Sequence, residues 1–216
     1  MKHKLAIVTG GGDCPGLNPA IRAVVQAASL DYGWSVVGIP DGFKGLLENK
    51  FLPLDLVNTN GIFSKGGTML GSSNVDTPFS VPVTRDGKRV YEDRSDEAME
   101  HLRKEGVTAM ICIGGDGTQC IALGMAEKGL KVVGIPKTID NDLNGTDMTI
   151  GFYTAVTTAV EALDKLHSTA ESHQRIMVVE VMGRNAGWIA LFSGLGGDAD
   201  VALIPEIPYE LTQVAR

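Results

Sequence analysis

Short apolar runs alternate with helix-like patterns along most of the chain. The runs typical of buried strands are residues 5–9, 34–39, 108–115, 131–136, 175–182 and 200–205. Apolar residues at helical spacing fill residues 18–30, 95–106, 118–129, 150–171 and roughly 186–195. This alternation predicts an α/β fold in three layers, with helices on both faces of a mainly parallel sheet.

Local signals place the ends of several elements. The helix over 95–106 is expected to have Ser95 as its N-cap, acidic residues in its first turn and a glycine at its end. Residues 86–90 (DGKRV) are typical of a hairpin or another excursion of the chain at the sheet edge. Residues 208–216 begin a helix-like pattern and then stop. We therefore expect a large domain over 1–150 and an incomplete second lobe over 151–216.

Polar or glycine-rich loops follow four of the predicted strands. They are 9–18 (TGGGDCPGLN), 114–118 (GGDGT), 137–142 (KTIDND) and 182–187 (MGRNAG). Ligands of parallel sheets bind beyond the carboxyl ends of the strands. The four loops should therefore converge on one rim and form one site.

Charge and composition limit the partners of that site. A net charge of −7 over 216 residues argues against nucleic acid or an anionic membrane, which need an extended basic surface. Cys14, Cys112 and Cys120 lack metal-like spacing, so we expect reduced and mostly structural thiols. No apolar run approaches membrane-spanning length, and the N-terminus reaches glycine too soon for a signal peptide. These features favour a cytoplasmic protein.

Two of the loops have the chemistry of a phosphate-donor site. In 9–18, glycines would let backbone N–H groups approach an anion at a helix N-terminus, and a plain tight turn is the alternative. In 114–118, Asp116 stands between glycines, where a carboxylate beside a phosphate cradle suits Mg²⁺; an N-cap role is the alternative. This second motif occurs in several kinase families, so it indicates phosphoryl transfer from a nucleotide without naming the acceptor.

The loop 137–142 offers groups for the acceptor side. Phosphoryl transfer to an alcohol needs a group that takes the hydroxyl proton, and a carboxylate can serve. Asp140 and Asp142 alternate along what we expect to be an extended segment, so they would face opposite sides. An Asx-rich turn is the alternative interpretation.

Two arginines flank the predicted strand 175–182. Arg175 and Arg184 suit phosphate recognition, although a solvent-facing position is the simpler interpretation of either one alone. Glu180 stands among valine and methionine, so we expect it to pair with a cation or to be hydrogen-bonded within a site.

These motifs, in this order, resemble 6-phosphofructokinase. The residues that carry the resemblance are 9–22, 66–73 (GGTMLGSS), 113–118, 136–147, 149–155, 172–187 and 205–206. The resemblance extends over the whole chain and corresponds to the N-terminal part of a family member. It implies phosphoryl transfer from ATP, with Mg²⁺, to the 1-hydroxyl of fructose 6-phosphate in glycolysis. It also implies a homo-oligomer, either a dimer or a tetramer.

The resemblance further implies roles for individual residues. Asp140 would be the general base, Thr138 would stand beside it, and Asp142 would support the metal or the reacting groups. Asp116 would bind Mg²⁺. The donor site would comprise Gly11, Gly115, Asp116, Gly117, Thr118 and Lys137. The sugar phosphate site would comprise Thr138, Ile139, Asp140, Arg175, Met182, Gly183 and Arg184, with Arg184 also catalytic and Arg175 reaching into a neighbouring subunit. Arg22 and Glu206 lie where bacterial relatives bind an effector phosphate, or are structural.

Departures from the family pattern bear on the donor. Asn74 replaces an arginine that contacts the donor phosphates in bacterial ATP enzymes, and Lys137 is typical of pyrophosphate-dependent members. Gly117 is typical of ATP-dependent members, and an aspartate there would put charge and bulk where the α-phosphate must pass. A lysine near the transferring oxygens helps with either donor. ATP is therefore favoured, with pyrophosphate as the alternative.

The family's later segment, which grips the sugar phosphate, has no counterpart in this sequence. A non-catalytic nucleotide- or phosphate-binding module is therefore a further alternative.

Overall fold

The computed structural model describes residues 3–215, and the chain divides into two compact units at Lys137 and Thr138. This division precedes the expected one between 150 and 151. The strands are β1 (Lys4–Thr9), β2 (Ser35–Ile39), β3 (Leu52–Leu54), β4 (Val81–Arg85), β5 (Lys88–Glu92), β6 (Ala109–Gly114), β7 (Lys131–Thr138) and β8 (Ile150–Gly151). The helices are α1 (Leu17–Gln26), α2 (Phe43–Leu47), α3 (Ser95–Glu105), α4 (Asp116–Glu127), α5 (Phe152–His173), α6 (Trp188–Gly196) and α7 (Leu211–Val214), and a π-helical turn, η1 (Ala27–Asp31), extends α1.

The main sheet has the strand order β3-β2-β1-β6-β7-β8. β1 pairs in parallel with β2 and β6, β6 pairs in parallel with β7, and β3 runs antiparallel to β2. Residues 5–9 of β1 are buried on both faces, as expected for a central strand of a parallel sheet. The predicted α/β fold with a mainly parallel sheet is confirmed.

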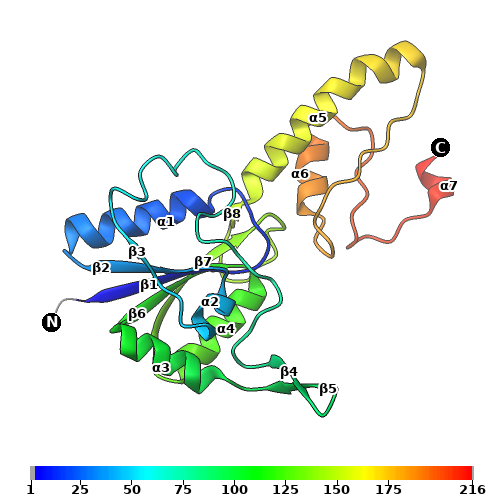
Figure 1. Ribbon diagram of the computed structural model, residues 1–216. Helices are drawn as coiled ribbons and strands as arrows, with labels where there is room; N and C mark the ends of the chain where they lie inside the picture. The colour runs from blue at the N-terminus through cyan, green and yellow to red at the C-terminus, as the bar shows by residue number, and fades with distance from the viewer. Residues whose placement is uncertain (1–2, 216) are drawn as a thin grey trace. The chain divides into compact units, whose positions relative to one another are not determined.

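Helices cover both faces of this sheet. Figure 1 shows α1 on one face and α3 and α4 on the other. The alternating residues Ala6 and Val8 of β1 belong to the core cluster that Leu102 of α3 and Met125 of α4 also join. Burial of these apolar side chains holds the layers together.

The helix α3 shows a correction to one predicted cap. Ser95 is the first helical residue and Arg94 occupies the N-cap position. The carboxylate Oδ1 of Asp93 accepts hydrogen bonds from the Ser95 backbone N–H (2.8 Å) and hydroxyl (2.5 Å). The carboxylate that accepts these bonds therefore lies two positions before Ser95, the residue expected as the N-cap. Gly106 ends the helix in the left-handed conformation, as predicted.

The predicted hairpin is confirmed as β4 and β5, but its expected place at the sheet edge is wrong, because the two strands form a separate two-stranded sheet. Asp86 and Gly87 both have positive φ, 51° and 71°. Two such residues make the type I′ turn that suits the twist of paired strands.

The second unit is mainly helical. α5 and α6 pack through aromatic side chains, with the ring of Phe192 lying 5.4 Å from Phe152 and 6.1 Å from Trp188 between centroids. His167 of α5 hydrogen-bonds through Nε2 to the carbonyl oxygen of Gly197, just after α6 (2.7 Å). In residues 3–215, no helix is both long and apolar enough to cross a membrane.

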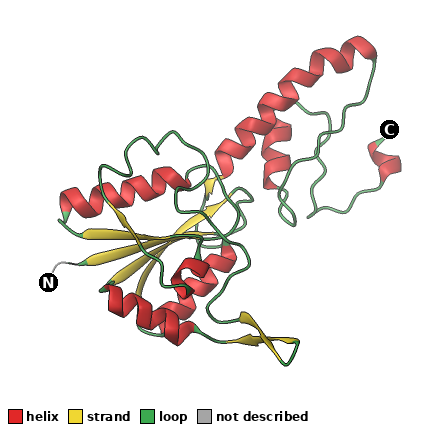
Figure 2. Cartoon of the chain, in the orientation of Figure 1, coloured by secondary structure: helices red, strands yellow, loops and turns green. Residues whose placement is uncertain are grey.

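Two of the strand predictions are wrong. Residues 175–182 and 200–205 form no strand, and Figure 2 shows these segments as loop. Ile176 is 93% exposed and Val178 is 89% exposed, so the apolar run is not buried. A strand is held by backbone hydrogen bonds to a neighbouring strand, and in the described residues neither segment joins a sheet.

None of the three cysteines, all of which lie in the described residues, forms a disulfide. Cys14 and Cys112 are buried and Cys120 is exposed. Burial raises the pKa of the Cys112 thiol to about 12, so this side chain stays neutral and acts as a small core residue.

We expect substitutions of buried and exposed leucines in the first unit to differ in their effect on the free energy of unfolding. Leu102→Ala, at a side chain only 1% exposed, should lower the free energy of unfolding by about 2–5 kcal/mol, because it leaves a cavity. Leu123→Ala, at 62% exposure on α4, should cost less than about 1 kcal/mol. Urea denaturation of both variants measures the difference, and equal costs would contradict this assignment of the core.

Candidate active site

The carboxyl ends of β1, β6 and β7 lie side by side in the first unit. The backbone N–H of Gly10 donates to the carbonyl oxygen of Ile113 at 3.0 Å, and Gly114 is in register with Pro136. The structure thus brings together the loop after β1, the turn after β6 and Lys137. The loop 182–187 follows no strand, so the expectation that it extends from a strand end is wrong.

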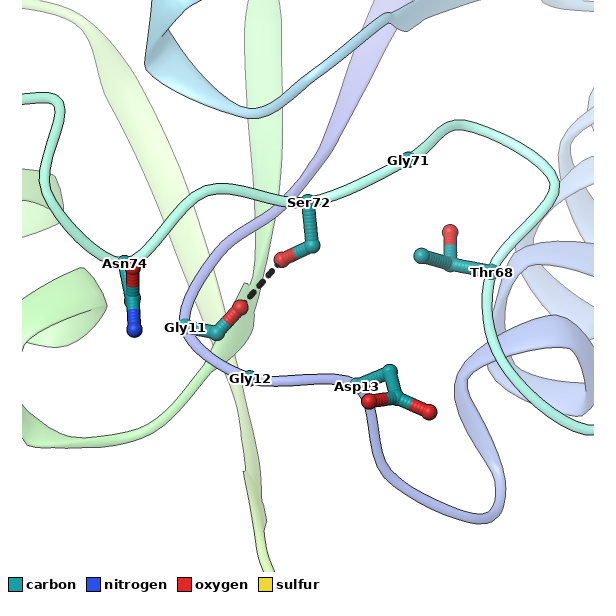
Figure 3. Close-up of a pocket in the computed structure, with 7 residues that line it drawn as sticks. All are labelled: Gly11, Gly12, Asp13, Thr68, Gly71, Ser72 and Asn74. Carbon is teal, nitrogen blue, oxygen red and sulfur yellow. Dashed lines mark hydrogen bonds between the residues drawn. The ribbon is translucent and has the colours of Figure 1, made fainter.

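A pocket of about 430 Å³ opens beside these strand ends. Its volume is within the range of small-molecule sites. Figure 3 shows its walls, one from the loop after β1 and one from the segment 68–74. The lining residues are Gly11, Gly12, Asp13, Thr68, Gly71, Ser72 and Asn74.

Hydroxyl groups join the two walls of the pocket. The Ser72 hydroxyl donates to the carbonyl oxygen of Gly11 at 2.5 Å, the bond drawn in Figure 3. The buried Thr9 hydroxyl donates to the carbonyl oxygen of Gly71 at 2.6 Å. Gly71 has a φ of +71°, and a Cβ there would lie 2.6 Å from Oδ1 of Asp41. The positive φ and the nearby carboxylate therefore favour glycine at position 71.

A buried cation supports the glycine loop. Lys137 is 3% exposed, and its Nζ donates to the carbonyl oxygen of Gly12 at 2.7 Å. Gly11 has a φ of +81°, and a Cβ at this position would lie 3.4 Å from the same Nζ. The ammonium group therefore lies close against the turn that lines the pocket, where it adds positive charge.

The N-terminus of α4 presents a carboxylate and open space. α4 begins at Asp116, two positions earlier than predicted, and Asp116 and Gly117 are both exposed. A Cβ at Gly117 would meet no atom within 4 Å. Thr118 is 5% exposed, and its Oγ1 lies 2.4 Å and 2.3 Å from the positions that a Cβ on Gly10 or Gly114 would take. Its side chain thus packs between the strand ends.

The described residues contain no group of three or more His, Cys, Asp or Glu side chains that could enclose a metal ion. Mg²⁺ usually keeps most of its waters and binds through one or two carboxylates together with substrate phosphates. The exposed carboxylate of Asp116 meets this requirement.

The acidic loop lies in the second unit and is bent. Asn141 has a φ of +52°, so the expected extended alternation of Asp140 and Asp142 is wrong. Oδ1 of Asn141 accepts a hydrogen bond from the backbone N–H of Thr149 at 2.9 Å. The Thr149 hydroxyl donates to the carbonyl oxygen of Thr138 at 2.7 Å. Asn141 therefore sets the shape of the turn, as the Asx alternative proposed.

Asp140 and Asp142 differ in their surroundings. Asp140 and Ile139 are half-buried, and the backbone N–H of Asp140 donates to the Thr138 hydroxyl at 3.1 Å. Asp142 is exposed. The bend thus holds the Asp140 backbone against Thr138 and leaves Asp142 toward solvent.

The predicted sugar-phosphate residues lie on the loop before α6. Arg175, Met182 and Arg184 are exposed, and Gly183 is buried with a φ of +144°. The carbonyl oxygen of Gly183 accepts a hydrogen bond from the Ala186 N–H at 2.8 Å, which closes a tight turn around Arg184.

Glu180, Arg22 and Glu206 are either exposed or bonded to nearby protein groups. Glu180 is exposed, so the expectation of a paired or buried carboxylate is wrong. The Nη1 of Arg22 donates to the carbonyl oxygen of Leu56 at 2.8 Å and the hydroxyl of Thr59 at 2.7 Å. Glu206 accepts a hydrogen bond from the Gly187 N–H at 2.7 Å. The structural alternative therefore accounts for Arg22 and Glu206.

Most residues of the pocket wall formed by 68–74 were not predicted as site residues from the sequence. Thr68, Gly71 and Ser72 belong to the motif GGTMLGSS, and Asp13 belongs to the glycine loop. The signal that could have found them is the repeated glycine and hydroxyl pattern of that motif, which predicts a tight, hydrogen-bonded loop.

Fold and pocket together define an α/β protein with a glycine-lined pocket at the carboxyl ends of parallel strands, where such sheets bind their ligands. Comparison with known proteins narrows this class. The sequence model described as Phosphofructokinase matches residues 4–216. The chain therefore belongs to the phosphofructokinase family.

Individual relatives agree with this assignment. ATP-dependent 6-phosphofructokinase 2 of Clostridium perfringens is 57% identical over 214 residues, covering 99% of this chain and 58% of its own length. Pyrophosphate–fructose 6-phosphate 1-phosphotransferase of Streptomyces coelicolor is 51% identical over 212 residues, covering 98% of this chain and 59% of its own length. The chain thus spans somewhat more than half of each relative.

A solved structure gives the same result. The crystal structure of Pichia pastoris phosphofructokinase matches with a TM-score of 0.84 at 35% identity, over 96% of this chain and 23% of that chain.

The hydroxyl bonds between the pocket walls predict a further stability effect. Thr9→Val keeps the shape of the side chain but leaves the Gly71 carbonyl without its donor, which should cost about 1–3 kcal/mol of unfolding free energy. The same change at exposed Thr84 of β4 should cost less than about 0.5 kcal/mol. Chemical denaturation compares the two, and an unchanged Thr9→Val variant would show that this bond is dispensable.

Proposed function

We propose that the protein transfers a phosphoryl group from ATP to the 1-hydroxyl of fructose 6-phosphate, giving fructose 1,6-bisphosphate in glycolysis. Membership of the phosphofructokinase family supports the reaction class. Names of similar proteins include both ATP and pyrophosphate as donors. The choice of ATP rests on one observation of the site, the open space at Gly117.

Gly117 supports ATP through space and charge. A Cβ there meets no atom within 4 Å, so the position borders space open to a ligand. Because glycine has no side chain, this space is free for the α-phosphate and nucleoside of ATP, which pyrophosphate lacks. An aspartate would fill the space and repel the α-phosphate. Lys137 beside Gly12 serves either donor, which keeps pyrophosphate as the second candidate.

The donor residues in this proposal are Gly11, Gly115, Asp116, Gly117, Thr118 and Lys137. Gly11 and Gly117 leave room for the phosphates, and Lys137 adds positive charge behind the glycine loop. Asp116 would hold Mg²⁺ together with the donor phosphates. When bound, Mg²⁺ supplies electrostatic stabilisation of the charge that develops on the transferred phosphoryl oxygens.

On the acceptor side, Asp140 takes the proton of the sugar 1-hydroxyl as that oxygen attacks phosphorus. Its position after Thr138 in a turn held by Asn141 supports this role, because a base must be held in place to act. Asp142 supports the reacting groups. The exposed Arg175 and Arg184, with Ile139, Met182 and Gly183, would bind the sugar phosphate, Arg175 from a neighbouring copy in a homo-oligomer.

Gly117→Asp tests the donor. In the intact protein, this variant should lose about tenfold or more in kcat/KM for ATP, because like charges a few ångström apart near a protein surface repel by a few kcal/mol. The kcat/KM for pyrophosphate should fall much less. Steady-state kinetics with each donor measure both values in one preparation, so the pyrophosphate arm controls for misfolding. Equal losses would show that position 117 does not select the donor.

Asp140→Ser tests the base. Substrate binding should persist while kcat falls by about 10²–10⁴-fold, the usual contribution of general base catalysis. Asp147→Ser, the same change at an exposed residue of the same loop, should leave kcat within about twofold. Retained turnover in Asp140→Ser would remove this carboxylate from the base role.

A further inference from the structure

One side-chain amide joins the two strands that lead into the donor loops. Gln119 is in the first turn of α4. Its Nε2 donates to the carbonyl oxygens of Gly114 at 2.9 Å and Ile135 at 3.2 Å, with that of Cys112 at 3.4 Å. Gly114 and Cys112 belong to β6 and Ile135 belongs to β7. The amide therefore ties α4, β6 and β7 to one another.

The bridge lies where the backbone pairing of β6 and β7 ends. Gly114 and Pro136 form the last pair in register. Proline has no N–H, so Pro136 contributes no donor to the ladder at this level. The Gln119 amide supplies donors at the point where the backbone has fewer of its own.

A glycine of β7 leaves the space that this amide occupies. A Cβ on Gly134 would lie 2.1 Å from Oε1 and 3.0 Å from Cδ of Gln119. Any larger residue at position 134 would push the amide away from its carbonyl partners. Gly134 of β7 thus leaves the room that the Gln119 amide of α4 needs for its hydrogen bonds.

The bridge connects the elements that carry the proposed donor residues. Lys137 follows Ile135 by two positions on β7 and reaches Gly12 through its Nζ. Asp116 and Gly117 form the beginning of the same helix that carries Gln119. A shift of β7 relative to α4 would change the separation between the lysine cation and the Asp116 turn.

We propose that Gln119 is a positioning residue for the phosphate donor. It holds Lys137 and the N-terminus of α4 at the spacing that the donor phosphates require, without contacting the donor. The inference rests on the proposed function and extends it to a residue outside the pocket.

Two variants remove the bridge from opposite sides. Gln119→Leu keeps the size of the side chain and removes its donors, and Gly134→Ala displaces the amide while leaving Gln119 in place. Each should raise the Kd for ATP with Mg²⁺ about tenfold, which corresponds to about 1.4 kcal/mol. The Kd for fructose 6-phosphate should stay within about twofold. Calorimetric titration of the intact protein measures both ligands.

Gln26→Leu is the matched control. It makes the same replacement at an exposed residue at the end of α1, and both dissociation constants should stay at their wild-type values. The double variant Gln119→Leu/Gly134→Ala should bind ATP no more weakly than either single variant, because both changes remove the same interaction. Additive losses would overturn the shared bridge.

The remaining outcomes separate the two proposals. A wild-type protein that binds ATP, with variants that bind it equally well, overturns the role of Gln119 alone. Equal weakening of ATP and fructose 6-phosphate overturns it too, since it indicates a general structural role. A wild-type protein that binds neither ATP nor pyrophosphate contradicts the proposed function, and the inference fails with it. If Gln119→Leu does not fold, Gly134→Ala alone carries the test.

Discussion

The parallel pairing of β1, β6 and β7 is the constraint on which the site depends. Parallel strands end at the same edge, so this pairing delivers the glycine loop, the Asp116 turn and Lys137 to one place. Side-chain hydrogen bonds then connect the loops that the strands bring together. Lys137 joins β7 to the glycine loop, and hydroxyl groups of Thr9 and Ser72 join that loop to the second pocket wall. The pocket is thus closed by bonds between segments far apart in sequence.

Glycine has two distinct uses around this pocket. At Gly11 and Gly71 the backbone has a positive φ, which glycine adopts most readily, and a Cβ at Gly71 would lie 2.6 Å from a carboxylate oxygen of Asp41. At Gly117 the backbone is helical and the surroundings are empty, so the missing side chain leaves room for a ligand. The first use shapes the pocket lining, and the second leaves open space at the start of α4. The sequence shows only that a position is glycine, so it does not distinguish these two uses.

The elements of the first unit were largely predictable because its signals are local. Alternating apolar runs indicate buried strands, and Asp86 with Gly87 indicates a two-residue hairpin turn. The runs 175–182 and 200–205 have the same apolar composition as true strands, but strand formation also requires a partner. In residues 3–215 neither run is paired in a sheet, so apolar composition alone was not enough to predict a strand there.

The sequence alone established the α/β class, the order of the loops and the family resemblance, because these depend on short-range periodicity and on motif order. It could not establish the bend at Asn141, the burial of Lys137 or the bridge from Gln119. Each of these depends on a partner that is distant in the sequence or on a backbone angle that several residue types adopt. Folding brings such groups within hydrogen-bond distance, and that proximity assigns the lysine to the glycine loop and the glutamine to two strand ends.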